Sequence, residues 1–292
     1  MLGEVLRRKG VSVERLVGLC EIKECGGIMA AARGEPSKQS LLSRQIKELE
    51  NALGYPLMDR SSSPSQLNPS GEALAKTVGR FISDFDRIAA VLSKQTVPLR
   101  IAASESLVLS YIIPILKRLG LSGTRSVQLL NMRSSESSRA LTEGKVDLAV
   151  SHSLSPSDGI KITELASYGL RLVGKKSAGV QKWSNLERRA LATLTGSGRL
   201  RQAVDRLVGE YPDGPFIALE CTSHTQLLAA CETLGAIAVI PEIALFHEPA
   251  KRLGSCPIAE LRNERFSVSC GWNVERAKDS NNLQLLIQEI LK

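Results

Sequence analysis

The stretch from Lys38 to Gly71 constrains the fold of this chain more than any other part, and it reads KQSLLSRQIKELENALGYPLMDRSSSPSQLNPSG. Its first half predicts a helix, because apolar residues recur at the spacing of one helical face: Leu42, Ile46, Leu49 and Leu53. The outward rows carry polar side chains three or four residues apart, which form one compact surface: Gln39, Ser40, Ser43, Arg44 and Lys47. Such side chains suit base edges and phosphate oxygens. We interpret this segment as a recognition helix.

The residues around this helix predict a winged helix-turn-helix. Two shorter helices are expected before it, one that starts at Val13 and ends near Gly26, and one over 28–33. Gly54 is suited to end the recognition helix, and residues 55–58 can form a short apolar strand. A polar loop over 60–66 then forms the wing. Asn68-Pro69 supplies the N-cap and first-turn residues that begin another helix.

Three ordered motifs in this region resemble the DNA-binding domain of the LysR-type transcriptional regulators. They are Leu42-Ser43-Arg44-Gln45, the turn from Gly54 to Arg60, and the start of the next helix from Leu67 to Gly71. Departures from the usual residues of the family bear on the bases that are read rather than on the fold, and they are Lys38, Ser40 and Met58. The resemblance implies sequence-specific binding of double-stranded DNA.

The chemistry of the side chains assigns the expected roles on DNA. Base edges in the major groove are expected to meet Gln39, Ser40, Ser43 and Arg44. Phosphates are expected to meet Lys38, Lys47 and Arg60.

A long helix is predicted from Ser70 to about Ser93, and its apolar stripe is too prominent for a lone exposed helix. The stripe has steps of three and four residues: Leu74, Val78, Phe81, Ile82, Phe85, Ile88 and Leu92. This face could dock on its own domain or pair with the same helix of a second subunit. We favour pairing, because winged helices that read two half-sites need a symmetric dimer. The resemblance implies the same, so a homodimer or homotetramer is expected.

After a hinge over 94–98 the sequence alternates strands and helices, which indicates a parallel sheet with helices on its faces. Two such α/β halves joined by two crossings would form a periplasmic-binding-protein-like domain with a cleft between them. Two segments resemble LysR-family signatures of this domain, Glu143 to Val150 and Leu234 to Pro241. The expected fold class is α/β, with an N-terminal winged helix-turn-helix rich in helix and a two-subdomain effector domain.

The length of 292 residues suits two or three domains. Residues 1–69 are expected to form the DNA-binding domain, 70–96 the linker or dimerisation helix and hinge, and 97–292 the effector-binding domain. Within the last domain, subdomain I is expected over 97–166 and 263–292, and subdomain II over 167–262.

Hydroxyl side chains follow the predicted strands of the effector domain. Open α/β sheets bind ligands at the carboxyl ends of their strands, where helix N-termini offer free N–H groups. The effector is expected to contact Ser104, Ser106, Ser134, Ser135, Thr195, Ser197, Thr222 and Ser223. Ser and Thr are also good N-caps wherever a helix starts, so each residue alone has a plain structural explanation. For the set as a whole we favour ligand binding, with a small carboxylate or similar anion as the expected effector.

Composition agrees with a nucleic-acid partner without proving one. The formal net charge is +8, but residues 1–95 hold 14 Lys and Arg against 11 Asp and Glu, a net of +3, so DNA binding must depend on local placement. No apolar run reaches the length of a membrane span, and the first residues lack the apolar core of a signal peptide. The six cysteines form no C-x-x-C pair, which favours free thiols in a reducing compartment. A cytoplasmic protein is expected.

The sequence offers little for catalysis or metal binding. Its three histidines stand in no recognised nucleophile or metal-ligand spacing, and Gly196-Ser197-Gly198 lacks the lysine of a phosphate loop. No catalytic residue, metal ligand or cofactor is predicted. A disulfide between Cys221 and Cys231 would make the chain a redox sensor, and spacing alone leaves this open.

The leading hypothesis is a DNA-binding regulator whose effector changes the angle between the two halves and so the spacing of the DNA-binding heads. The alternative is a soluble small-molecule-binding protein or enzyme whose N-terminal helices only dimerise it. That alternative predicts ligand binding without salt-dependent affinity for duplex DNA.

Overall fold

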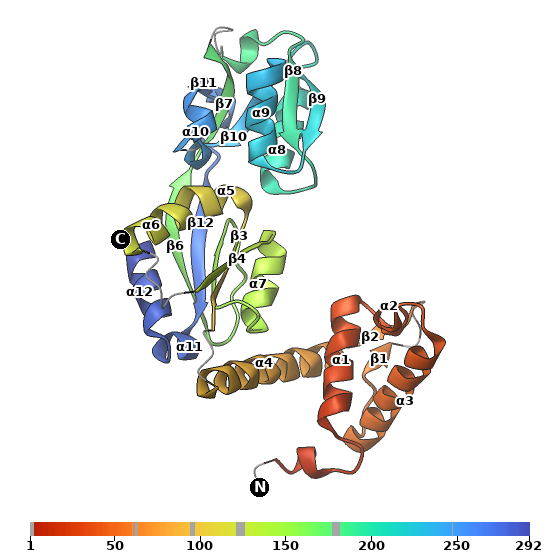
Figure 1. Ribbon diagram of the computed structural model, residues 1–292. Coiled ribbons are helices and arrows are strands. Elements are labelled where there is room, and N and C mark those ends of the chain that lie inside the picture. Colours follow the sequence, from red (N-terminus) through yellow and green to blue (C-terminus); the bar gives the residue numbers. More distant parts are fainter. Residues whose placement is uncertain are drawn as a thin grey trace. The chain divides into compact units, whose positions relative to one another are not determined.

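The computed structural model of the chain describes residues 3–59, 61, 64–93, 97–120, 126–176, 182–246 and 248–292. The backbone divides into an N-terminal unit, Met1–Val97 with Thr142–Lys145, and a C-terminal unit, Pro98–Leu141 with Val146–Lys292. Figure 1 labels the helices and strands of both units. Each unit has its own buried apolar core.

The N-terminal unit is a winged helix-turn-helix followed by a long helix. Its elements in chain order are α1 Val13–Cys25, α2 Ile28–Ala32, α3 Pro36–Leu53, β1 Met58–Asp59, β2 Gln66–Leu67 and α4 Pro69–Leu92. β1 and β2 pair antiparallel, with Met58 opposite Leu67. The predicted recognition helix corresponds to α3, and Leu42, Ile46 and Leu49 on its apolar face are each at most 3% exposed. They join a core with Leu19 and Ile22 of α1, which fixes the outward face of α3.

Polar contacts join the end of α3 to the wing and to α4. Gly54 ends α3 with a left-handed backbone at φ 86°. The buried carboxylate of Glu50 accepts hydrogen bonds from the backbone N–H groups of Leu57 at 2.7 Å and Met58 at 3.1 Å. Asn68 caps α4 by accepting a hydrogen bond from the N–H of Gly71 at 2.9 Å, and its amide donates to the carbonyl of Pro56 at 2.9 Å.

The C-terminal unit contains two five-stranded sheets. Lobe I is built on the sheet ordered β4-β3-β5-β12-β6, and lobe II on the sheet ordered β11-β7-β10-β8-β9. The strands of lobe I are β3 Leu99–Ala103, β4 Val127–Asn131, β5 Leu148–Ser151, β6 Ile160–Tyr168 and β12 Phe266–Asn273. Those of lobe II are β7 Leu170–Lys175, β8 Ala190–Leu194, β9 Phe216–Cys221, β10 Ile237–Pro241 and β11 Leu253–Pro257.

Both sheets are mixed, which corrects the expectation of parallel sheets. β3 pairs parallel with β4 and β5, and β8 pairs parallel with β9 and β10. β12 pairs antiparallel with β5 and β6, and β7 pairs antiparallel with β10 and β11. The chain passes from lobe I to lobe II at Gly169, between β6 and β7, and returns to lobe I through β12. The antiparallel pairs of both sheets therefore involve the strands at these crossings, β7 in lobe II and β12 in lobe I.

Helices cover both sheets (Figure 1), and they are α5 Glu105–Leu107, α6 Ile113–Leu119, α7 Ser134–Thr142, α8 Arg199–Glu210, α9 His224–Leu234, α10 Glu248–Lys251, α11 Val274–Lys278 and α12 Asn281–Ile290. A π-helical turn, Val108–Ile112, joins α5 to α6. Pro114 follows it, and because proline has no N–H and crowds the carbonyl four residues before it, a widened turn is the expected result.

The predicted fold class, an N-terminal winged helix-turn-helix followed by a two-subdomain α/β domain, is confirmed. β6 and β11 were not predicted from the sequence, and they are held in their sheets by pairing with β12 and β7. Among the helices of the described residues, none combines the length and apolar character needed to cross a membrane.

Candidate DNA-binding and effector sites

The outward face of α3 presents a polar and basic surface. The side opposite the buried leucines and isoleucine carries five exposed residues, which are Gln39, Ser40, Ser43, Arg44 and Lys47. Glu35, the N-cap residue of α3, makes no side-chain capping hydrogen bond. The first backbone N–H groups of a helix have no partner within the helix. Such groups and the positive end of the helix dipole suit a phosphate.

Two of the predicted phosphate contacts differ from the residues on the exposed face of α3. Lys38 is half-buried, and its Nζ pairs with Oε1 of Glu21 on α1 at 2.5 Å. A phosphate at this position must therefore compete with Glu21 for Lys38. Arg60, the predicted wing contact, lies outside the described residues.

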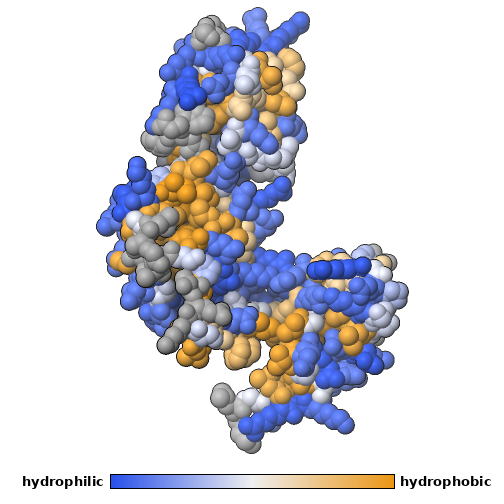
Figure 2. Space-filling view, viewed as in Figure 1, coloured by the Kyte–Doolittle hydropathy of each residue, from blue (hydrophilic) through white to orange (hydrophobic). Residues whose placement is uncertain are grey.

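An apolar stripe is exposed along α4. Phe81 and Phe85 are each 62% exposed, and their ring centroids lie 6.3 Å apart. Ile88, Val91 and Leu92 continue the stripe and are also more than half exposed. Figure 2 shows hydrophobic residues gathered along α4 and α1 of the N-terminal unit. Exposed apolar surface of this kind marks a site of association.

The predicted effector residues follow the carboxyl ends of parallel strands in both lobes. In lobe I, Ser104 and Ser106 follow β3, and Ser134 and Ser135 follow the neighbouring β4. The hydroxyls of Ser104 and Ser106 lie 3.3 Å apart, but Ser106 is only 2% exposed and faces the interior. In lobe II, Thr195 and Ser197 follow β8, and Thr222 and Ser223 follow the neighbouring β9.

The two lobes contact each other beside these loops. Thr225 in the first turn of α9 donates a hydrogen bond from Oγ1 to Oε1 of Glu105 at 2.8 Å. Ser110 in the π-helical turn donates to the carbonyl of Ile243 at 3.2 Å. Glu105 stands between Ser104 and Ser106, and Thr225 closely follows Ser223. The structure therefore brings the loop after β3 next to the loop after β9. Glu105 was not among the residues predicted from the sequence, because a carboxylate between two serines matches no motif.

A buried aromatic cluster lies where the crossing strands meet. The hydroxyl of Tyr168 and Nδ1 of His152 lie 2.7 Å apart, and Tyr168 stacks on Phe266 with ring centroids 5.8 Å apart. Burial lowers the pKa of His152, against an opposing backbone hydrogen bond with Ser267, and burial raises the pKa of Tyr168. At neutral pH both side chains are therefore uncharged, and one hydrogen bond joins them. The guanidinium of Arg199 lies 5.1 Å from the ring centroid of Phe266.

All six cysteines are free. Burial, with a smaller effect of Cys221, raises the pKa of Cys231 to about 12. Burial also raises the pKa of Cys221. Reactive cysteines need a lowered pKa, so the two thiols lack the electrostatic setting of a redox sensor.

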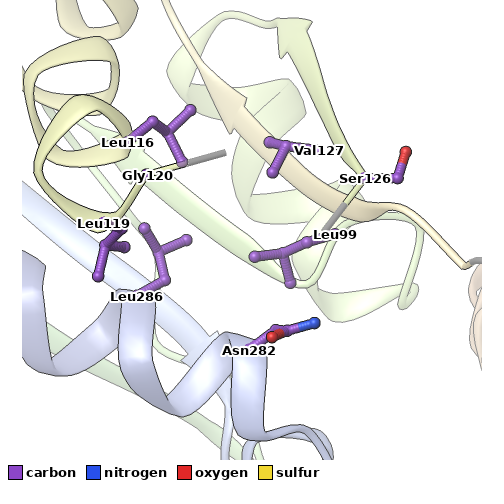
Figure 3. Close-up of a pocket in the computed structure, with 8 residues that line it drawn as sticks. All are labelled: Leu99, Leu116, Leu119, Gly120, Ser126, Val127, Asn282 and Leu286. Atoms are coloured by element: carbon purple, nitrogen blue, oxygen red, sulfur yellow. The ribbon is translucent and has the colours of Figure 1, made fainter. Parts of the chain in front are cut away.

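A small apolar cavity lies in lobe I, and it does not coincide with the predicted effector residues. Leu99, Leu116, Leu119 and Leu286 point toward one another there (Figure 3), together with Gly120, Ser126, Val127 and Asn282. Its volume is about 20 Å³, which is room for about one water molecule. Leu99 and Val127 begin β3 and β4, so the cavity lies at the amino ends of these strands. The predicted effector residues follow the carboxyl ends.

A winged helix-turn-helix joined to a two-lobed α/β unit is the architecture of a ligand-responsive DNA-binding regulator. The family model described as "Bacterial regulatory helix-turn-helix protein, lysR family" matches residues 13–72. The model described as "LysR substrate binding domain" matches residues 94–292. The chain belongs to the LysR family of transcriptional regulators.

Individual relatives and solved structures agree with this assignment. The HTH-type transcriptional regulator MetR of Escherichia coli strain K12 is 27% identical over 165 residues, which are 56% of this chain and 52% of MetR. The chain thus spans about half the length of the curated relatives it matches. Full-length CbnR complexed with its target DNA has a TM-score of 0.54 and 22% identity, covering 96% of this chain and 98% of CbnR. LysG from Corynebacterium glutamicum with bound effector Arg has a TM-score of 0.59 and 19% identity, covering 96% of each chain.

Proposed function

We propose that this chain is a sequence-specific DNA-binding transcriptional regulator controlled by a small molecule that binds between lobes I and II. The observation that carries the proposal is the exposed face of α3, where side chains suited to base edges and to phosphates share one surface of a winged helix-turn-helix. Family membership supports it, and so does the binding of target DNA by CbnR, a protein of the same fold. The bound effector Arg of LysG supports a ligand in the C-terminal unit.

The assignments of individual residues remain those expected from the sequence. The base edges would meet Gln39, Ser40, Ser43 and Arg44. The phosphates would meet Lys38, Lys47 and Arg60. The effector would meet the hydroxyls between the lobes, with Ser106 supporting the others from the interior.

The regulator works as a homodimer or a pair of homodimers in this proposal. The exposed stripe of α4 is covered by the same helix of a second copy, which places two recognition helices on two half-sites. In this proposal the DNA-binding domain comprises residues 1–69. The dimerisation helix and hinge comprise residues 70–96, and the effector domain comprises residues 97–292. The chain acts by binding rather than by catalysis, in the cytoplasm, where its DNA is.

Arg44→Ala tests whether the exposed face of α3 contacts the bases of DNA. The substitution is expected to weaken binding to the operator by about 10- to 100-fold, because a bidentate contact to a base contributes on the order of 1–3 kcal/mol of discrimination. The operator would first be selected from random duplexes with the wild-type chain. Its affinity would then be measured by fluorescence anisotropy at two salt concentrations, alongside a scrambled duplex.

The matched control for this experiment is Arg252→Ala, which removes an exposed arginine of the C-terminal unit. It is expected to leave operator affinity within about twofold of the wild type, since losing one distant surface charge has a small effect. Equal effects of the two substitutions would reject Arg44 as a base contact. A wild-type chain that selects no duplex and binds all DNA alike would favour the alternative, a small-molecule-binding protein dimerised by its N-terminal helices.

A further inference from the structure

We infer that the effector carries a protonated amine and that Glu105 is the residue that selects it. The inference rests on the proposed function, since it concerns the ligand of the same site between the lobes. It departs from the anion expected from the sequence, because the structure places a carboxylate among the hydroxyls.

Glu105 reaches from lobe I to lobe II. It is the first residue of α5 and directly follows Ser104, which ends the connection from β3. Its Oε1 accepts the 2.8 Å hydrogen bond from Thr225 of α9. The carboxylate therefore lies where the loop after β3 meets the loop after β9, between two groups of predicted effector residues.

The second carboxylate oxygen of Glu105 has unused hydrogen-bonding capacity. Oε2 is buried and, within the described part of the chain, has no hydrogen-bond partner. A buried carboxylate oxygen without a donor is unfavourable, and an ammonium group offers three donors and the opposite charge. A carboxylate ligand at the same place would be repelled at close range. The electrostatics of this position favour a cationic group.

Thr222 on the lobe II side also presents an acceptor. The N–H of Thr222 donates to Oε1 of Gln226 at 2.8 Å, which identifies that atom as oxygen. The hydroxyl of Thr222 donates to the same oxygen at 3.0 Å, so its lone pairs remain for a donor from outside. Ser223 instead accepts from the N–H of Gln226 at 3.3 Å, which leaves its hydroxyl proton to donate. The hydroxyl oxygen of Thr222 can therefore accept a hydrogen bond from an amine, and the hydroxyl of Ser223 can donate one to a carboxylate. The two neighbouring residues suit a molecule that carries both groups.

The arginines of lobe II that follow β8 are engaged by protein groups. Arg201 pairs with Asp205 at 2.7 Å and with Glu220 at 2.8 Å. Arg199 lies over Phe266. A purely anionic effector would have to compete with these contacts, whereas an amine has the Oε2 oxygen of Glu105 as a partner. The chemical class that fits both sets of groups is an amino acid or a similar small zwitterion.

Recognition of this amine is coupled to the contact between the lobes. Because Oε1 of Glu105 already accepts the hydrogen bond from Thr225, a ligand that binds this carboxylate would alter the contact between α5 and α9. Another interlobe hydrogen bond, from Ser110 to the carbonyl of Ile243, lies on the π-helical turn that continues from α5. Binding at Glu105 would therefore act directly on the contacts that hold lobe I against lobe II.

The experiment uses the full chain and defined probes. Each standard L-amino acid is added at millimolar concentration. Its matched 2-oxo acid, which lacks the α-amine, is added in parallel for all except proline, lysine and arginine, because these have no matched 2-oxo acid free of a basic nitrogen. Thermal unfolding identifies binders, since a ligand that binds only the folded state raises Tm. Calorimetry then gives Kd for the wild type, for Glu105→Gln and for Glu275→Gln. The first substitution keeps an acceptor for Thr225 and removes only the charge, and Glu275 is an exposed residue of α11.

The expected result is that at least one amino acid raises Tm by several degrees while its 2-oxo acid does not. Glu105→Gln should weaken that binding by about 10- to 100-fold, the range for losing a hydrogen bond to a charged group. Glu275→Gln should leave it unchanged. The inference is overturned if no amino acid binds, if a 2-oxo acid binds as tightly as its amino acid, or if Glu105→Gln retains full affinity. Operator binding is measured on the same wild-type preparation: if it is present the proposed function survives that failure, and if it is absent the proposed function fails on its own.

Discussion

Gly71→Ala is expected to lower the free energy of unfolding of the N-terminal unit by about 3 kcal/mol, the upper end of the usual effect of overpacking. A methyl group at this position would lie 2.2 Å from the carbonyl oxygen of Leu57, which is a backbone atom that no rotamer change can move. The N–H of Gly71 also donates the capping hydrogen bond to Asn68. Relief of the clash would therefore separate α4 from the wing. Urea unfolding followed by circular dichroism measures the loss.

The same helix offers a matched control for this substitution. Gly79 also lies in α4, and its added methyl would meet only Sγ of Cys20, at 3.9 Å, an ordinary contact. Gly79→Ala should raise stability by about 0.5–1 kcal/mol, because Ala favours the helix over Gly. If the two substitutions changed stability alike, the close approach of Gly71 to Leu57 would not be the cause. Gly71 is the last residue of the Leu67 to Gly71 motif, so the clash also explains why the motif ends in glycine.

The double substitution Phe81→Asp and Phe85→Asp is expected to convert a dimer into monomers and to lower operator affinity by about 100-fold or more. Two linked DNA-binding domains bind DNA on the order of 10²- to 10⁴-fold more tightly than one domain, without any new contact to DNA. Charges placed in the centre of the exposed stripe of α4 would prevent a second helix from covering it. Both rings are already 62% exposed within one chain, so folding of the monomer should survive. Light scattering gives the mass, and anisotropy gives the affinity.

Phe216→Asp is the control for the loss of an exposed aromatic ring, since Phe216 lies on β9 of the C-terminal unit and is 52% exposed. It should leave both the dimer and operator binding intact. A double α4 variant that remained dimeric with unchanged affinity would show that α4 is not the dimer contact. A variant that became monomeric but kept full affinity would instead separate dimerisation from DNA binding.

Local sequence was sufficient for the elements of the N-terminal unit. The spacing of Leu42, Ile46 and Leu49 determined both that α3 is a helix and which face it buries, because side chains three and four apart share one face. Gly54 and Asn68-Pro69 determined where α3 ends and α4 begins, since caps act through neighbouring backbone groups. The three ordered motifs identified the family for the same reason, as they encode this local geometry.

What the sequence could not decide depends on partners distant in the chain. β6 was missed because Ile160–Tyr168 is stabilised by pairing with β12, about a hundred residues later, rather than by its own pattern. The pairing of Lys38 with Glu21 and the hydrogen bond from Thr225 to Glu105 have the same origin. Only the folded chain places Glu105 beside the residues predicted to bind the effector, so the charge proposed for the ligand follows from the tertiary structure. The sequence by itself determined the DNA-binding domain and the family, because those features are local. Contacts between residues far apart in the chain decided the chemistry of the site proposed between the lobes.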